Sequence, residues 1–197
     1  EAGQLEFIAQ HFDSVELNNS FYRLPTVATF DDWRNKVPKD FVFAVKGSRY
    51  ITHMKKLKVE KEEVAHFLDR AMGLKEKLGV VLFQLHPAMK KNMERLEHFL
   101  NLLPPSLRFT LEFRNHSWYG DDVYDLLSRY KVSFCIYELD RHLSPIQVTT
   151  DFVYLRLHGP GAKYQGSYSD ETLKSWAQRC IQWQKAGKDV FVYFDND

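Results

Sequence analysis

The chain has 197 residues, of which 44% are hydrophobic and 27% are charged, and its formal net charge at pH 7 is +1. This balance is typical of a globular protein with one sizeable core, and it gives no general attraction to nucleic acid or anionic lipid. No stretch approaches the roughly 18 consecutive apolar residues of a membrane span. The two cysteines, Cys135 and Cys180, lack metal-ligand spacing, so we expect a reduced, cytoplasmic location without membrane association.

Apolar runs of strand length alternate with amphipathic helical patterns along the chain. Residues 1–12 read as part of a helix, and seven strands are then predicted, at residues 14–22, 41–48, 79–86, 108–114, 132–138, 152–159 and 189–196. Apolar residues repeat every three or four positions in five predicted helices, at residues 28–37, 59–78, 91–103, 121–130 and 169–187. The connection at residues 139–151 contains Pro145 and no helical period, so we expect it to be irregular.

The repeated order of strand, helix and strand predicts parallel strands joined by right-handed crossovers. Seven such strands favour an α/β fold of the TIM type, a (β/α) barrel, formed by a single domain over residues 1–197. An eight-stranded barrel typically takes about 250 residues. We therefore expect the first strand to be missing before Glu1 and the chain to be truncated at both ends. The alternative, a doubly wound sheet, usually has a glycine-rich first turn, and the sequence contains no such turn.

Charged residues occupy alternate positions in the predicted strands. In the segment TLEFRNHSW, Glu112 and Arg114 alternate with Leu111 and Phe113. If the apolar residues face the helices, the charged residues point into the barrel. The same phase places further pairs inward, which are Glu16 and Asn18, Lys46 and Ser48, Gln84 and His86, Arg156 and His158, and Tyr193 and Asp195. All lie near the carboxyl-terminal ends of strands, where barrel enzymes keep their catalytic groups.

A purely structural interpretation competes with a functional site. Buried charges cost several kcal/mol unless they are paired, so Glu112 with Arg114, or Glu16 with Lys46, could form structural ion pairs. However, a structural barrel interior is normally filled by branched apolar side chains. Six strands that each contribute polar groups at one level therefore favour a functional site.

Six segments of the chain match the motifs of a known protein family. These segments are VELNNSFYRLP, FAVKGSRYITHMKKLK, FQLHP, LEFRNHSWY, YLRLHGPGAKYQGSYSDETL and VYFDND. They resemble successive motifs of the YecE-like family, also called domain of unknown function 72, over essentially the whole chain. The resemblance implies a TIM-barrel architecture. It implies no particular reaction, because the family has no established one. Members of the family usually begin with a Gly-Thr-Ser-Gly-Trp segment that forms the first strand, and this segment is absent here. Asp195 stands where the family usually has Asn, and His86 where it more often has Pro, so neither is assigned an essential role.

The inward residues predict acid–base chemistry. Two carboxylates, Glu112 and Glu16, are candidates for acid and base, and His158 is a candidate proton shuttle. A core histidine bonded to the backbone is the alternative for His158. Cations on neighbouring strands could clamp a phosphate or carboxylate group of a substrate, and these are Lys46, Arg49, Arg114 and Arg156.

The loop GPGAKYQGSYSDE, residues 159–171, follows the strand after which many barrels bind phosphate through glycine backbone. A flexible lid, with Tyr164 and Tyr168 on its rim, is the alternative interpretation. Together these arguments predict a set of ligand-binding residues, which are Asn18, Tyr22, Lys46, Arg49, His53, Gln84, Arg114, Trp118, Arg156, Gly159, Tyr164, Tyr168, Tyr193 and Asn196.

Three functions are compatible with these residues. We favour a hydrolase or lyase that acts on a small anionic or polyol-like substrate. The alternatives are a nucleic-acid-binding or nucleic-acid-processing barrel, contacted through Lys55, Lys56 and Lys58, and a non-catalytic ligand-binding module. Residues 49–58 read as a lid with a basic, aromatic face. No cofactor is predicted, and a metal ion is disfavoured because no HxH or HExxH spacing occurs and cations crowd the same interior. The sequence leaves the oligomeric state open.

Overall fold

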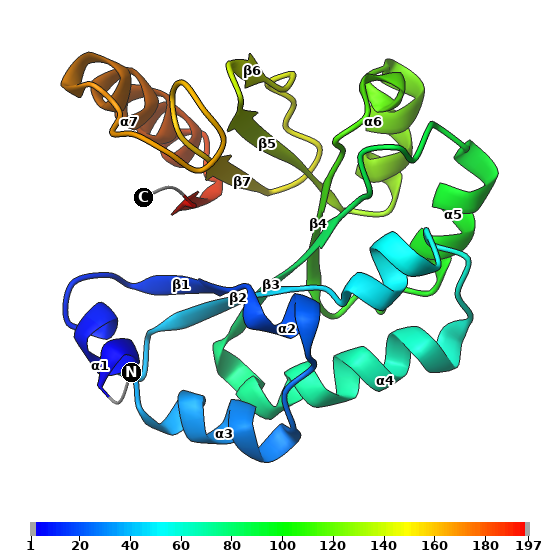
Figure 1. Ribbon diagram of the computed structural model, residues 1–197, viewed down its shortest axis with the longest axis horizontal. Coiled ribbons are helices and arrows are strands. Elements are labelled where there is room, and N and C mark those ends of the chain that lie inside the picture. Colours follow the sequence, from blue (N-terminus) through cyan, green and yellow to red (C-terminus); the bar gives the residue numbers. More distant parts are fainter. Residues whose placement is uncertain (1–2, 196–197) are drawn as a thin grey trace. The chain divides into compact units, whose positions relative to one another are not determined.

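Parallel strands follow one another in chain order. The computed structural model, which describes residues 3–195, contains the strands β1 (Ser14–Leu17), β2 (Val42–Lys46), β3 (Leu78–Gln84), β4 (Arg108–Glu112), β5 (Ser133–Leu139), β6 (His142–Leu143), β7 (Phe152–Leu157) and β8 (Asp189–Phe194) (Figure 1). Their order in the sheet is β1-β2-β3-β4-β5-β7-β8, and β6 pairs only with β5, antiparallel. Sequential parallel strands with intervening helices are the connectivity of the TIM-type (β/α) barrel. The predicted fold class is therefore confirmed.

The predicted helices form between these strands. The α-helices are α1 (Gln4–Ala9), α2 (Asn19–Tyr22), α3 (Val27–Asn35), α4 (Lys61–Ala71), α5 (Met93–Asn101), α6 (Asp121–Arg129) and α7 (Asp170–Lys185). A π-helical turn, η1, covers Tyr50–Met54, and two 3₁₀ segments, η2 and η3, cover Met72–Lys77 and His116–Trp118. No helix among residues 3–195 is both long enough and apolar enough to cross a bilayer.

The chain divides into two compact units that share strand β4. The N-terminal unit comprises Glu1–Phe109 and Phe113–Ser117, and the C-terminal unit comprises Thr110–Glu112 and Trp118–Asp197. Each unit has its own buried strands, which are β2 and β3 in the N-terminal unit and β5 and β7 in the C-terminal unit.

The core of the N-terminal unit is built around β2 and β3. The ring of Phe83 lies 5.0 Å from that of Phe99 in α5 and 6.0 Å from that of Phe67 in α4, between ring centroids. All three side chains are buried, and each contributes about 1.5–3 kcal/mol relative to exposure. Helix α4 begins at a capping box in which Glu60 and Glu63 each accept a backbone N–H of the other's turn. These contacts fix α4 and α5 against the strands.

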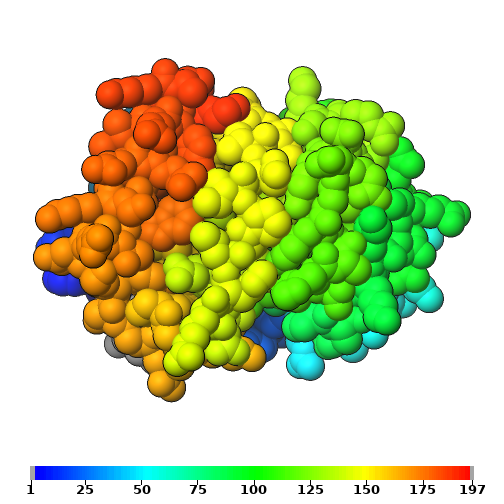
Figure 2. All heavy atoms as spheres, turned by 90° about the horizontal axis from the view of Figure 1, so that it is seen from above, coloured from blue at the N-terminus to red at the C-terminus, as the bar shows by residue number. Residues whose placement is uncertain are grey.

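The core of the C-terminal unit is formed by β5 and β7, which are almost entirely buried. The connection after β6 is irregular, as predicted, and its hydroxyl groups replace missing sheet partners. Thr149 Oγ1 accepts the Phe134 N–H at 2.9 Å, and Ser144 Oγ accepts the Tyr137 N–H at 2.9 Å. Helix α7 has no fully buried residue, and Figure 2 shows its segment, in orange, spread over one face of this unit.

Two predicted elements were wrong in extent. The strand predicted at 14–22 ends at Leu17, because Ser20 Oγ donates hydrogen bonds to the carbonyls of Leu17 (3.0 Å) and Lys46 (2.7 Å) and so stabilises the short helix α2. The helix predicted at 59–78 breaks after Ala71 into η2, where Lys75 adopts a positive φ of 50°. Side-chain hydrogen bonding and local backbone geometry decided both ends.

Candidate functional site

Four charged or titratable side chains meet at the carboxyl-terminal ends of strands in the C-terminal unit. Glu112 ends β4, Arg156 lies near the end of β7, and His158 and Asp195 directly follow β7 and β8. Arg156 Nη1 donates to Glu112 Oε2 at 2.7 Å, and Arg156 Nη2 donates to Asp195 Oδ2 at 3.0 Å. We call these four residues the charged network. Glu112 and Arg156 therefore point to the same face of the sheet, as the two-residue alternation predicts.

The histidine completes the charged network. His158 Nε2 lies 3.2 Å from Arg156 Nη1, and because a guanidinium can only donate, Nε2 accepts this bond. The ring proton is thereby assigned to Nδ1, which lies 3.2 Å from Asp195 Oδ2. His158 is thus held between a cation on one side and a carboxylate on the other.

The members of the charged network differ in exposure. The side chains of Glu112, Arg156 and His158 are 0% exposed, whereas that of Asp195 is 35% exposed. A buried ion pair needs close partners to offset its desolvation, and Arg156 has a carboxylate on each side. Asp195 is consequently the member through which the charged network meets solvent.

Hydroxyl and thiol groups surround the charged network. The Cys135 thiol lies 3.8 Å from Glu112 Oε2, within reach of a weak hydrogen bond. The Tyr119 hydroxyl lies 2.9 Å from that of Tyr137 and 3.2 Å from His142 Nε2. Burial, the hydrogen bond with Tyr137 and the Glu112 carboxylate all raise the pKa of Tyr119 above its usual range. Tyr119 is therefore a hydroxyl donor or acceptor and not a phenolate.

The glycine-rich loop covers His158. The ring centroid of Tyr164 lies 5.3 Å from that of His158, and the two rings meet edge to face. The Gly159 N–H donates to the Tyr168 hydroxyl at 3.1 Å, and burial raises the pKa of Tyr168 to about 12, with a further contribution from the Glu138 carboxylate. Gly159 has a φ of 102°, a conformation that favours glycine. Gly159 and Tyr168 are therefore joined by a hydrogen bond, whereas Tyr164 packs on His158.

A second group of predicted residues gathers in the N-terminal unit, and we call it the basic cluster. The ring centroids of His53 and His86 lie 5.1 Å apart, and Lys46 Nζ lies 4.7 Å from the Phe21 ring, which itself packs on His53. Burial makes the largest contribution to lowering the pKa of His53 to about 4, and the positive charges of His86, Lys46, Arg49 and Arg114 contribute the rest, in that order. The predicted clamp residues Lys46, Arg49 and Arg114 thus share one neighbourhood around His53.

The remaining predicted residues lie in varied environments. Glu16 is half-buried in β1, Gln84 is half-buried at the end of β3, and Asn18 has a buried Oδ1 without a hydrogen-bond donor among the described residues. Tyr22 is 79% exposed, whereas Trp118 is completely buried.

Two predicted residues, Tyr193 and Asn196, lie near the carboxyl-terminal end of the chain. Tyr193 is buried, with its ring centroid 5.2 Å from that of Tyr154. Asn196 lies outside the described residues.

Sequence reasoning underestimated three features of these sites. The two-residue alternation had already placed Asp195 and His86 inward, but neither was given a role, and both contact predicted site residues. The hydrogen bond between the hydroxyl groups of Tyr119 and Tyr137 was not predicted, because Tyr119 lies in an irregular segment.

Among residues 3–195, no group of three or more His, Cys, Asp or Glu residues is arranged to hold a metal ion.

The family model described as "Protein of unknown function DUF72" matches residues 1–197. The chain belongs to the DUF72 family. Among curated relatives, this DUF72 protein is 26% identical to the UPF0759 protein YunF of Bacillus subtilis (strain 168), over 98% of this chain and 80% of YunF. It is 31% identical to the UPF0759 protein YecE of Escherichia coli (strain K12), over 59% of this chain and 43% of YecE.

Solved structures of DUF72 family proteins share the fold. One from Enterococcus faecalis V583 superposes with a TM-score of 0.85 and 21% identity, over 100% of this chain and 87% of the other. Another, from Thermotoga maritima MSB8, gives a TM-score of 0.79 and 27% identity, over 94% of this chain and 78% of the other. The names of these relatives state no reaction.

Proposed function

We propose that this DUF72 protein is an enzyme of the hydrolase or lyase class that acts on a small anionic or polyol-like substrate. The observation that carries the proposal is the exposed carboxylate of Asp195 at the edge of an otherwise buried charged network. Barrel enzymes hold their reacting groups at the carboxyl-terminal ends of strands, which is where the charged network lies.

Asp195 is the candidate catalytic residue because, of the four members of the charged network, it is the one that reaches solvent, and this proposal revises the sequence-based expectation that Asp195 has no essential role. Arg156 donates to it at 3.0 Å, and the carboxylate of Asp195 is the candidate acceptor for a proton from water or from a substrate hydroxyl. Glu112 and His158 are positioning residues in this scheme: Glu112 orients Arg156, and His158 Nδ1 lies 3.2 Å from Asp195 Oδ2, a close contact without hydrogen-bond geometry. The pairing of Glu16 with Glu112 as acid and base stays a prediction.

Turnover measurements test this assignment. A panel of sugars, polyols, sugar phosphates and organic acids is first screened by thermal shift, and every hit is then assayed for product. Asp195→Asn should lower kcat by about 10²–10⁴-fold while ligand binding persists. Asp125→Asn, on the exposed face of α6, removes a carboxylate elsewhere in the same unit and serves as the control. Turnover that survives in Asp195→Asn would refute the role of Asp195.

The positioning role of His158 needs a separate readout. His158→Gln retains a hydrogen-bonding side chain, so we expect kcat to fall less than in Asp195→Asn while KM stays unchanged. Unchanged kcat in His158→Gln would show that His158 serves only the packing of the core.

A second candidate function, a ligand-binding module for a small anion, is favoured by the basic cluster. Three cationic side chains lie near His53, and guanidinium groups bind phosphate and carboxylate well. In this case sulfate and phosphate should bind in isothermal titration, and Arg114→Gln should weaken binding by about tenfold or more. Retained affinity in Arg114→Gln would count against the module.

The nucleic-acid alternative rests on the lid lysines. Lys55 Nζ lies 3.8 Å from a Glu63 carboxylate oxygen and 5.4 Å from the Tyr50 ring centroid, so part of its charge is already compensated. Affinity for nucleic acid that falls steeply with salt concentration would favour this alternative.

A further inference from the structure

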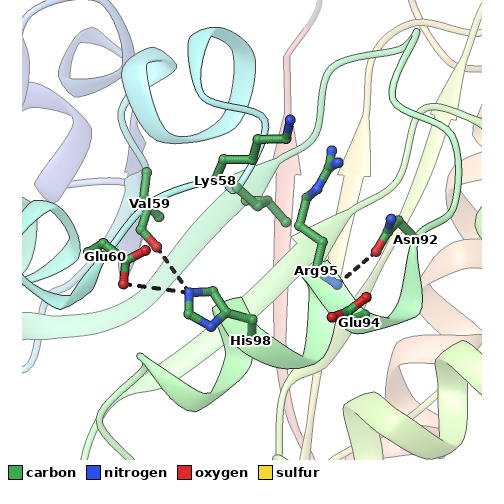
Figure 3. A pocket seen from close by; sticks show the side chains of 8 residues that line it. Lys58, Val59, Glu60, Asn92, Glu94, Arg95 and His98 are labelled. Atoms are coloured by element: carbon green, nitrogen blue, oxygen red, sulfur yellow. Dashed lines mark hydrogen bonds and ion pairs between the residues drawn. The ribbon is translucent and has the colours of Figure 1, made fainter.

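A pocket outside both sites described above lies in the N-terminal unit, between the segment that follows η1 and the first turns of α5. Its volume is about 410 Å³, which is within the range of small-molecule sites. Figure 3 shows the side chains that line it, which include Lys58, Glu60, Asn92, Glu94, Arg95 and His98. The floor is apolar, because Leu57 and Val59 also line the pocket and are buried.

Two cations define one end of the pocket. Lys58 and Arg95 point the same way in Figure 3, away from the carboxylates of Glu60 and Glu94. Within residues 3–195, neither the ammonium of Lys58 nor the guanidinium of Arg95 has a hydrogen bond or ion pair to another side chain. Both cations line the pocket, and an anion bound there would compensate their charge.

The position of Arg95 is unfavourable for the helix alone. Arg95 lies in the first turn of α5, where the helix dipole favours anions and disfavours cations. Its backbone N–H already donates to the Asn92 side chain at 2.8 Å, so the helix terminus is capped. A ligand in the pocket would therefore be bound by side chains and not by this backbone N–H. A cation that opposes local stability at a pocket wall is typical of a functional position.

The opposite end of the pocket offers hydrogen-bond acceptors. His98 Nε2 lies 3.3 Å from the Val59 carbonyl oxygen and 3.9 Å from Glu60 Oε2 (Figure 3). The carboxylate of Glu94 also lines the pocket, beside Asn92 and Arg95 in the same view. Carboxylates accept hydrogen bonds from hydroxyl groups.

We propose that this pocket binds a small phosphate monoester of a hydroxylated compound, with its phosphate against Lys58 and Arg95 and its hydroxyl groups toward Glu60 and Glu94. Lysine and arginine side chains are standard phosphate ligands, and an apolar floor suits the carbon skeleton. The pocket shares no residue with the charged network or with the basic cluster.

Isothermal titration with glucose 6-phosphate, inorganic phosphate and glucose tests the proposal on the full chain. Glucose 6-phosphate should bind more tightly than inorganic phosphate, and glucose alone should not bind measurably. Lys58→Ala and Arg95→Gln should each weaken binding of glucose 6-phosphate by about tenfold or more, the scale of one charge-assisted hydrogen bond. Arg70→Gln, a matched loss of one arginine from helix α4, should leave the affinity unchanged.

Stability separates loss of the ligand from loss of the fold. Arg95→Gln removes a cation from the first turn of α5, so its melting temperature should equal or exceed that of the parent chain. Equal weakening by Arg95→Gln and Arg70→Gln would reveal diffuse electrostatics and overturn the proposal. Binding that is lost in Arg114→Gln but retained in Arg95→Gln would assign the anion to the basic cluster and would also overturn it.

Discussion

Replacement of Glu112 by glutamine tests whether the charged network stabilises the C-terminal unit. Glu112 Oε2 and Arg156 Nη1 are 2.7 Å apart, and both side chains are 0% exposed. Removal of one partner of a buried pair typically costs about 3–5 kcal/mol, because the other charge stays buried without compensation. Glutamine keeps an oxygen acceptor, and Asp195 remains 3.0 Å from Arg156 Nη2, so we expect the lower value, about 3 kcal/mol.

That free energy is measurable in a chain of this size. A loss of about 3 kcal/mol corresponds to a fall in melting temperature of about 6–12 °C for domains of this length. Urea unfolding followed by tryptophan fluorescence gives the free energy directly, with Asp125→Asn as the control. The double variant Glu112→Gln/Arg156→Met should recover at least half of the loss, because an apolar replacement of a buried pair is often neutral.

A small effect would refute this reasoning. If Glu112→Gln loses less than about 1 kcal/mol, the pair contributes no more than a surface ion pair, despite its burial. Near-normal melting would also return Glu112 to consideration as an acid or base in catalysis. A recovery in the double variant would instead confirm that the uncompensated charge of Arg156 causes the loss.

Two further predictions concern single residues. His53 has a folded pKa of about 4, below its unfolded value near 6.5, so its contribution to stability is present above pH 6.5 and is lost as the pH falls from 6.5 to 4. In His53→Asn, the free energy of unfolding measured in urea should therefore depend less on pH over that window. Gly159→Ala should destabilise the chain by about 1–3 kcal/mol, because φ is 102° and the new Cβ would clash with the Gln165 carbonyl oxygen. Gly161 has open space around the position of a Cβ, so Gly161→Ala should be neutral and serves as the control. Equal melting temperatures for the two variants would contradict this prediction.

The sequence alone determined the order and facing of the strands. Alternation of polar and apolar residues has a period of two in any strand, so Leu111 against Glu112 and Leu155 against Arg156 were assigned to opposite faces without coordinates. The order of strands and helices likewise predicted the parallel connectivity. These features depend on local periodicity, which the sequence records directly.

The tertiary structure decided which side chains become partners and where elements end. Glu112 pairs with Arg156, which is 44 residues away, and no local pattern encodes such a pairing. Strand β1 stops at Leu17 because Ser20 reaches the Lys46 carbonyl of another strand. Asp195 joined the charged network for the same reason: adjacent strand ends bring distant residues within hydrogen-bond range, and only the folded backbone sets those distances.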